Sequence, residues 1–171
     1  VHIPYCHELC WYCGCNTKAT HSYAPVAEYV QYLQTEIANL AALVPRGHIV
    51  TQVHWGGGSP NMLAPSDIAS LADALRSAFK LDGSEFAVEI DPRHLKPDQI
   101  AAFCRAGVTR VSVGVQDFDE TVQAAIGRRQ SFLATKNAIN GFRDGGVCSV
   151  NIDLMYGLPH QTRRSIDGTL E

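Results

Sequence analysis

The residues best suited to chemistry are four cysteines near the start of the chain, Cys6, Cys10, Cys13 and Cys15. The first three have the spacing C-x3-C-x2-C. A thiolate is a soft ligand that binds iron–sulfur clusters, zinc or copper(I). Three thiolates on one short loop can hold three irons of a [4Fe–4S] cluster and leave the fourth iron open for a small molecule, whereas an electron-transfer cluster normally has four cysteine ligands. Loop geometry alone does not decide whether Cys15 is also a ligand.

Zinc is the main alternative for this group of cysteines. A structural zinc site usually takes two separated pairs of ligands, and the remaining cysteines, Cys104 and Cys148, are single and far apart. His2 or His7 could supply a fourth ligand, so a zinc-stabilised binding module stays open as the alternative from a different class. A disulfide framework fits less well, because cysteines this close in a chain of ordinary core composition do not resemble a secreted staple pattern.

The elements that must position this loop alternate between strand and helix. Short β-branched or alternating runs predict strands at residues 1–4, 49–55, 86–90, 110–115 and 147–155. Apolar residues at three- and four-residue steps, with proline or acidic residues at several starts, predict helices at residues 24–44, 65–79, 97–107, 120–126 and 132–143. Pro45-Arg46-Gly47 ends the first helix, and residues 165–171 begin a further one. This alternation indicates βαβ units and a parallel sheet in one domain.

Each predicted strand ends in a polar or glycine-rich string. In chain order these are the cysteines, Gly56–Gly58, Glu89 to Asp91, Gln116 and Asp153. Parallel barrels and doubly wound sheets both place ligands at the carboxyl ends of their strands, so one face of the sheet should gather the chemistry. A Rossmann sheet is the less favoured of the two, because no G-x-G-x-x-G opens a helix after the first strand.

The composition is that of an ordinary globular domain. The chain has 171 residues, of which 46% are hydrophobic and 18% charged. A net charge of −3 gives no reason to expect binding to nucleic acid or to an anionic membrane, and no apolar run approaches the roughly 20 residues of a membrane helix. Six cysteines without a recognisable secretory leader favour a reducing cytoplasm. The abrupt ends of the pattern suggest a fragment of a longer protein.

The cysteine spacing, with the aromatic Tyr12 before the third cysteine, resembles the cluster motif of radical S-adenosylmethionine (SAM) enzymes. The longer string, from His2-Ile3-Pro4-Tyr5-Cys6 through Cys13-Gly14-Cys15-Asn16, resembles the oxygen-independent coproporphyrinogen III oxidases of haem biosynthesis. Three later strings agree with that family and extend the resemblance over the whole chain: residues 54–60 (HWGGGSP), 114–118 (GVQDF) and 151–159 (NIDLMYGLP).

The resemblance implies an α/β fold, a partial (β/α)6 radical SAM barrel with parallel strands and outer helices that is truncated after the fifth strand. Residues 1–171 would be the radical SAM core domain, with an N-terminal lead-in, a sixth β/α unit and a C-terminal domain outside the chain. The implied reaction is the oxidative decarboxylation of two propionates of coproporphyrinogen III, giving protoporphyrinogen IX through a SAM-derived 5′-deoxyadenosyl radical. A monomer that receives electrons from a separate donor is expected.

Two other activities lie close by in the same superfamily. One is a haem chaperone, in which phenylalanine is expected where this chain has Cys15. The other is a radical SAM methyltransferase or haem-degrading enzyme.

The resemblance also assigns roles at the cluster and at one SAM molecule. Cys6, Cys10 and Cys13 correspond to the cluster ligands, and Cys15 does not. Gly57 and Gly58 belong to the segment that contacts the SAM amino group, where Ser59 stands in place of threonine. Glu89 corresponds to a carboxylate on the SAM ribose, and a carboxylate can accept hydrogen bonds from both hydroxyls. The residues themselves leave simpler roles open: a flexible turn for the glycines, and for Glu89 a solvated carboxylate at a strand end or an ion pair with Arg93 or Arg110.

A second SAM beside the first is implied by Tyr12, the Gly58-Ser59 segment, Gln116, Arg128 and Asp153. Arginine suits a carboxylate and aspartate suits an ammonium, the two charges of a methionyl group. Gly127 departs from the asparagine expected before Arg128. Tyr12 could also act as an aromatic lid over the cluster loop, a role compatible with stacking on a ligand.

Overall fold

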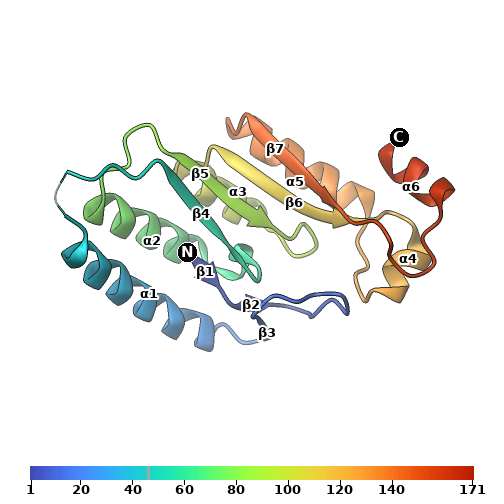
Figure 1. Ribbon diagram of the computed structural model, residues 1–171, viewed down its shortest axis with the longest axis horizontal. Coiled ribbons are helices and arrows are strands. Elements are labelled where there is room, and N and C mark those ends of the chain that lie inside the picture. The colour runs from blue at the N-terminus through green and yellow to red at the C-terminus, as the bar shows by residue number, and fades with distance from the viewer. Residues whose placement is uncertain (46) are drawn as a thin grey trace.

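The computed structural model describes residues 1–45 and 47–171, so Arg46 of the predicted helix stop lies outside the described residues. Five parallel strands form one sheet in the order β1-β4-β5-β6-β7 (Figure 1). They are β1 (His2–Ile3), β4 (Gln52–Gly57), β5 (Glu85–Ile90), β6 (Arg110–Gln116) and β7 (Ser149–Leu154). A second, two-stranded parallel sheet joins β2 (Tyr5–Cys6) to β3 (Lys18–Ala19) at the two ends of the cysteine loop.

The described residues form six helices and one 3-10 turn, of which all but the last helix lie between strands. They are α1 (Ala24–Leu43), η1 (Pro60–Met62), α2 (Pro65–Ala78), α3 (Pro97–Arg105), α4 (Glu120–Ala125), α5 (Phe132–Asp144) and α6 (Arg163–Leu170). Every strand and helix predicted from the sequence is present, with ends that differ by a few residues. The largest shift is in β4, which begins at Gln52 because Ile49 forms only an isolated bridge with Lys80. The β2–β3 pair was not predicted.

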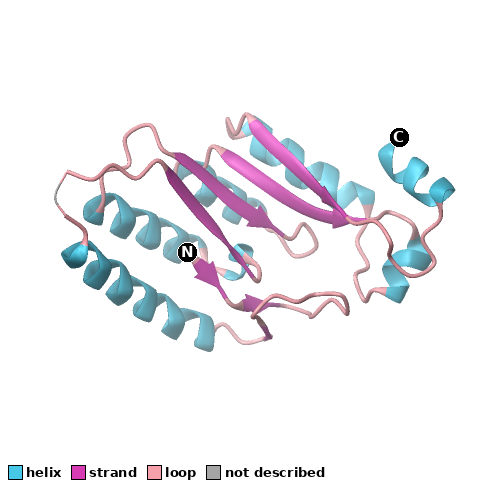
Figure 2. Ribbon diagram, in the orientation of Figure 1, coloured by secondary structure: helices cyan, strands magenta, loops and turns pink. Residues whose placement is uncertain are grey.

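The sheet winds in one direction, as a barrel does. Helices α1, α2, α3 and α5 lie along the same face of the sheet, each packed on the next (Figure 2). The spatial order of the strands follows their order in the chain, whereas a doubly wound sheet reverses its order at a switch point. The barrel expectation is therefore confirmed over the Rossmann alternative.

The helix-covered face holds the hydrophobic core. The largest fully buried side chain is Trp55 of β4, whose ring meets the rings of Phe86 and Phe103 edge to face. Along β5 and β6, buried residues alternate strictly with half-exposed ones. Strands covered on both faces would be apolar throughout, so the alternation shows that the second face of this sheet is open.

The open face is polar and in register. Glu89 of β5 pairs with Ser112 of β6, Ser112 pairs with Asn151 of β7, and Gly114 pairs with Asp153. Since side chains at alternate positions of a strand share a face, these residues lie on the side away from the helices. The same geometry therefore buries the core and presents a row of polar groups.

A buried glutamine fixes the segment that follows the β4 glycines. Gln99 of α3 donates from Nε2 to the carbonyls of Asn61 and Leu63, at 2.6 and 2.9 Å, and accepts from the Lys96 amide at 3.0 Å. Together with the Asn61 side chain, which bonds to the Asp91 backbone, Gln99 anchors η1 beside the open end of the sheet.

We predict that Gln99→Ala destabilises the protein by about 2–4 kcal/mol, because two buried carbonyls lose their donors. The control Gln31→Ala, on the exposed face of α1, should change stability by about 0.5 kcal/mol or less. Urea unfolding of both variants measures the difference. Equal effects would show that Gln99 has no anchoring role.

Candidate functional site

All eleven residues predicted to bind the cluster or SAM line one pocket at the carboxyl ends of the strands. The pocket has a volume of about 190 Å³. The predicted residues that line it are Cys6, Cys10, Tyr12, Cys13, Gly57, Gly58, Ser59, Glu89, Gln116, Arg128 and Asp153. They come from separate parts of the chain, so the fold brings the whole predicted set together. Their individual roles stay predictions.

The three spaced cysteines lie on the loop between β2 and β3. Cys6 ends β2 and its Sγ lies 3.3 Å from the Thr17 hydroxyl, while Cys13 follows a turn in which its amide donates to the Cys10 carbonyl at 3.1 Å. Burial raises the pKa of the Cys6 thiol, and the hydrogen bond with Thr17 acts in the opposite direction. Cys15 lies on the same loop and is exposed.

Among residues 1–45 and 47–171, no three His, Cys, Asp or Glu side chains lie close enough together to hold one metal ion. The three spaced cysteines stay the predicted cluster ligands. The two histidines considered as zinc ligands have other contacts: His2 Nε2 lies 2.9 Å from the Asn16 carbonyl, and the His7 ring packs on His94.

The β4 glycines are needed for close packing, which the flexible-turn alternative does not explain. Gly57 has a φ of +105°, and a Cβ added there would collide with the His2 ring. A Cβ added at Gly58 would lie 2.6 Å from the Tyr5 carbonyl oxygen and 2.7 Å from that of Ile3. The end of β4 therefore lies directly against the strands that lead into the cysteines.

Glu89 faces the pocket with both oxygens engaged. Its Oε1 lies 3.0 Å from His54 Nε2, and its Oε2 accepts from the Gly57 amide at 3.2 Å. The ion pairs considered from the sequence are wrong, because Arg93 pairs with Asp91 and Arg110 with Glu85. With 45% of its side chain exposed, Glu89 keeps acceptor capacity toward the pocket.

Asp153 and Gln116 are held by the β6–β7 pair. The Asp153 carboxylate accepts from the Ser112 hydroxyl at 2.9 Å and from Asn151 Nδ2 at 2.7 Å. Gln116 has a φ of +73° and lies beside a register shift between Gly114 and Gln116. A non-glycine residue in this region carries strain of about 1–3 kcal/mol, and such strain often occurs at functional sites.

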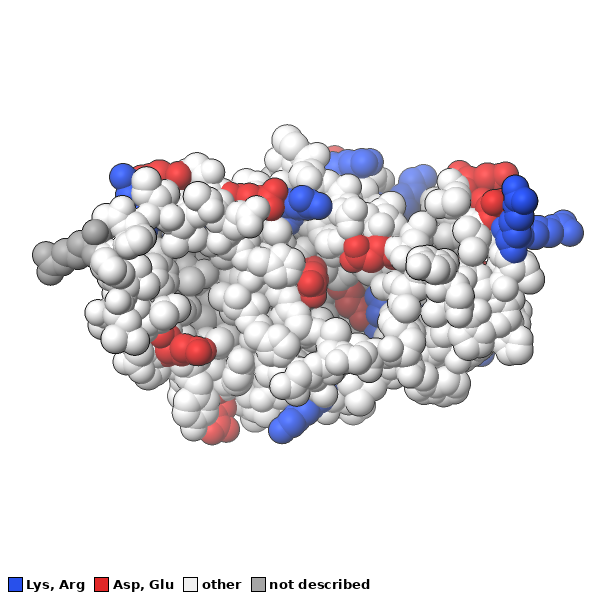
Figure 3. Space-filling model, viewed as in Figure 1, with Lys and Arg blue, Asp and Glu red and all other residues white. Residues whose placement is uncertain are grey.

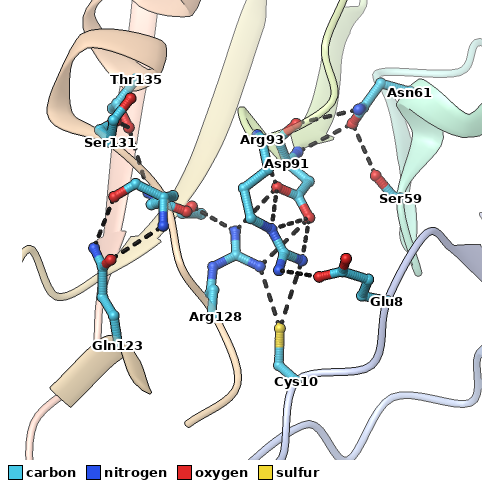
Figure 4. A network of polar contacts seen from close by, with 12 residues as sticks. Glu8, Cys10, Ser59, Asn61, Asp91, Arg93, Gln123, Arg128, Ser131 and Thr135 are labelled. Atoms are coloured by element: carbon cyan, nitrogen blue, oxygen red, sulfur yellow. Dashed lines mark hydrogen bonds and ion pairs between the residues drawn. The ribbon is translucent and has the colours of Figure 1, made fainter. Parts of the chain in front are cut away.

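Arg128 reaches into the pocket from the loop after α4. Its Nη2 donates to the Gly114 carbonyl at 2.6 Å and lies 3.5 Å from Asp91, and its Nη1 lies 3.5 Å from Cys10 Sγ (Figure 4). Tyr12 packs against the small apolar cluster of Val122, Ile126 and Leu158. Burial raises the pKa of its hydroxyl, while the Arg128 charge opposes the shift.

The glycine before Arg128 has a physical reason. Gly127 has a φ of +64°, and a Cβ added there would lie 2.9 Å from Trp11 Nε1. The Trp11 amide also donates to the Ile126 carbonyl at 2.9 Å. The indole of Trp11 therefore occupies the space that the expected asparagine side chain would need.

Sequence reasoning missed several pocket residues. Asp91 was noted only at a strand end, and Arg93 only as a partner for Glu89. The structure places both in the pocket, where the Asp91 carboxylate accepts from the Arg93 amide at 3.1 Å and from its guanidinium at 2.7 Å. Burial alone would raise the pKa of Asp91, but its contacts with Arg93 and Arg128 outweigh burial and lower it. The signal available was an acid and a base two residues apart after a strand.

We predict that Cys10→Ala removes most of the iron and sulfide bound by the full-length protein after anaerobic reconstitution, because one of three thiolate ligands is lost. Cys15→Ala, the matched control on the same loop, should keep its content. Iron and acid-labile sulfide analysis checks both. Normal content in Cys10→Ala, or an equal loss in Cys15→Ala, would contradict the ligand assignment.

Comparisons with known proteins place this geometry in a family. The model of the radical SAM superfamily matches residues 1–171. Oxygen-independent coproporphyrinogen III oxidase from Bradyrhizobium diazoefficiens is 46% identical over 163 residues, which cover 95% of this chain and 36% of the relative. The oxidase from Paracoccus denitrificans is 43% identical over 94% of this chain and 36% of its own length. The chain thus spans little more than a third of these relatives.

Solved structures agree. Coproporphyrinogen III oxidase from Escherichia coli, described as a radical SAM enzyme, has a TM-score of 0.93 at 40% identity over 99% of this chain and 39% of its own. A radical SAM methyltransferase from Kitasatospora setae shares the fold, with a TM-score of 0.65 at 16% identity over 96% of this chain and 32% of its own. These matches confirm the radical SAM fold expected from the sequence, and the chain belongs to the radical SAM superfamily.

Proposed function

We propose that this chain is the radical-generating core of an oxygen-independent coproporphyrinogen III oxidase. The observation that carries the proposal is the gathering of all eleven predicted residues around one pocket at the carboxyl ends of the strands. The 40–46% identity to oxidases from several bacteria supports the choice of substrate within the superfamily. Propionate side chains of coproporphyrinogen III would be oxidatively decarboxylated to vinyl groups.

Cys6, Cys10 and Cys13 would hold a [4Fe–4S] cluster at the mouth of the pocket. When bound and reduced, the cluster supplies the electron that cleaves the sulfonium of SAM and so provides a 5′-deoxyadenosyl radical for hydrogen abstraction. The protein contributes ligands, orientation and shielding. The three ligands come from one short segment, because the thiols lie on a single loop that the β2–β3 pair closes.

The first SAM molecule would lie between the β4 glycines and Glu89. Glycine at positions 57 and 58 lets backbone groups approach a ligand without obstruction by a side chain. Glu89 is fixed by the Gly57 amide and His54, so its carboxylate is already oriented for the two ribose hydroxyls.

A second SAM molecule would use Tyr12, Gly58, Ser59, Gln116, Arg128 and Asp153. Asp153 is oriented by Ser112 and Asn151 and suits an ammonium group. The Arg128 guanidinium suits a carboxylate, although it also contacts Asp91 and Cys10. Gly127 has no side chain, and the Trp11 indole lies where one would be. The contacts of Asp153 and Arg128 do not involve residue 127.

We further propose a cytoplasmic monomer that takes its electrons from a separate donor and binds neither nucleic acid nor a membrane. The net charge of −3 supports the lack of a nucleic-acid surface. The charged side chains on the face shown in Figure 3 are of both signs and scattered. In the described part of the chain, no helix combines the length and the apolar character needed to cross a membrane.

The test of this function is a product assay on the full-length protein, reconstituted without oxygen, reduced, and given SAM and coproporphyrinogen III. We expect both 5′-deoxyadenosine and protoporphyrinogen IX. 5′-Deoxyadenosine without protoporphyrinogen would keep the radical chemistry and move the substrate to that of a haem-related relative. Neither product, with zinc bound in place of iron, would overturn the assignment of the cysteine loop.

We predict that Asp153→Asn lowers the number of SAM molecules bound per full-length protein from two toward one, because the group for the second ammonium is lost. The control Asp82→Asn removes the same charge at an exposed position just before β5, at the opposite end of the sheet. Isothermal titration calorimetry of the reconstituted protein measures the stoichiometry. An unchanged value of two in Asp153→Asn, or a value of one in the parent protein, would contradict the second site.

A further inference from the structure

Two arginine side chains converge on the sulfur of Cys10. Arg93 Nη2 donates to Cys10 Sγ at 3.6 Å, and Arg128 Nη1 donates to the same atom at 3.5 Å (Figure 4). The three residues are separated in the chain by 83 and 118 positions, counted from Cys10. Asp91 lies between the two guanidinium groups, 2.7 Å from Arg93 Nη2 and 3.5 Å from Arg128 Nη2.

The buried charges of this group do not cancel. The side chains of Arg93, Arg128 and Asp91 are only 6%, 8% and 14% exposed. Two positive charges therefore face one negative charge, and an unpaired buried charge is costly. Glu8 lies 3.6 Å from Arg93 Nη1, but 59% of its side chain is exposed, so solvent weakens the contact. The proposed cluster with its cysteine ligands, an anionic group, would supply the missing negative charge.

The hydrogen bonds of the two arginines also leave room for a further acceptor. Among the described residues, Arg93 Nη1 and Arg128 Nε are buried and have no hydrogen-bond partner. A simple Asp91–Arg93 pair at the end of β5 would not need a second arginine. The two unpartnered nitrogens leave donor capacity for a further anion at this end of the pocket.

We propose that Arg93 is a positioning residue for the cluster, which acts with Arg128 and Asp91 to orient the Cys10 sulfur as a ligand and to raise the cluster's reduction potential. The inference rests on the proposed cluster. Reduction adds one electron from the external donor to the bound cluster, with no other bond made or broken. Because the reduced cluster carries one more negative charge, a neighbouring excess positive charge favours it. Hydrogen bonds to the sulfurs act in the same direction.

Three substitutions in the reconstituted full-length protein separate this role from a structural one. Arg93→Gln removes a positive charge and keeps a donor of similar length. Arg93→Lys keeps the charge and loses the planar fork. Asp91→Asn removes the negative charge with little change in shape. Arg129→Gln is the matched control, since Arg129 is exposed, adjacent to Arg128, and in none of the ion pairs of the described residues.

The measurement is a redox titration of the bound cluster followed by electron paramagnetic resonance, with iron and sulfide content determined on the same samples. We expect Arg93→Gln to disfavour the reduced cluster about tenfold, a shift of about 59 mV to lower potential for a one-electron couple. Asp91→Asn should shift the potential in the opposite direction. Arg93→Lys should recover at least half of the change, and Arg129→Gln should change the equilibrium less than twofold.

A midpoint in Arg93→Gln within twofold of the parent overturns the proposal, as does a shift of the same sign in Asp91→Asn. If Arg93→Gln binds no cluster, the Lys and Asn variants decide: retention in Arg93→Lys with a raised potential in Asp91→Asn supports the proposal. Loss of the cluster in all three variants, with unfolding, shows a structural role only. If the parent itself binds no [4Fe–4S] cluster, it is the proposed function that fails.

Discussion

The site depends on how closely the end of β4 approaches the strand that leads into the cysteine loop. The Gly58 amide donates to the Ile3 carbonyl and the Ser59 amide to the Tyr5 carbonyl, both at 2.8 Å. Glycine at 57 and 58 is what permits this contact, since any side chain there would meet the His2 ring or a backbone oxygen. Backbone hydrogen bonds consequently join the strand before the thiols to the glycine segment, and the Gly57 amide links that segment to the Glu89 carboxylate.

From that contact the rest of the pocket follows by register. Because β5, β6 and β7 pair in parallel, their carboxyl ends lie at the same edge of the sheet. Along each strand, successive side chains point alternately toward the core and toward the pocket. The polar residues of the open face then support one another: His54 orients Glu89, and Ser112 with Asn151 orients Asp153. Groups that would bind ligands are thus positioned by hydrogen bonds from neighbours on the same sheet, an arrangement that limits the reorganisation needed on binding.

Local pattern was enough to predict the strands, the helices and the polar strings at the strand ends, since periodicity and strand ends are properties of short segments. Tyr12, Ser59 and Arg128 were predicted as pocket residues only through the family resemblance. Three features were beyond both. The two-residue strands β2 and β3 carry no periodicity and exist only because the loop between them closes. The Glu89 partner was misassigned because its true partner, His54, lies on the neighbouring strand at a distance of 35 positions. Asp91 and Arg93 lie on one loop and Arg128 on another, and only tertiary structure reveals that their side chains meet at Cys10 on a third.

The contact between Trp11 and Gly127 has a consequence for how this sequence can vary. The indole lies where a Cβ at position 127 would be, so a side chain can be added at 127 only if the indole moves or is removed. A lineage that acquires asparagine at 127 must turn this exposed indole outward or exchange Trp11 for a smaller side chain. A side chain transplanted singly into position 127 would therefore meet an epistatic penalty beside Trp11 that is absent where residue 11 is small.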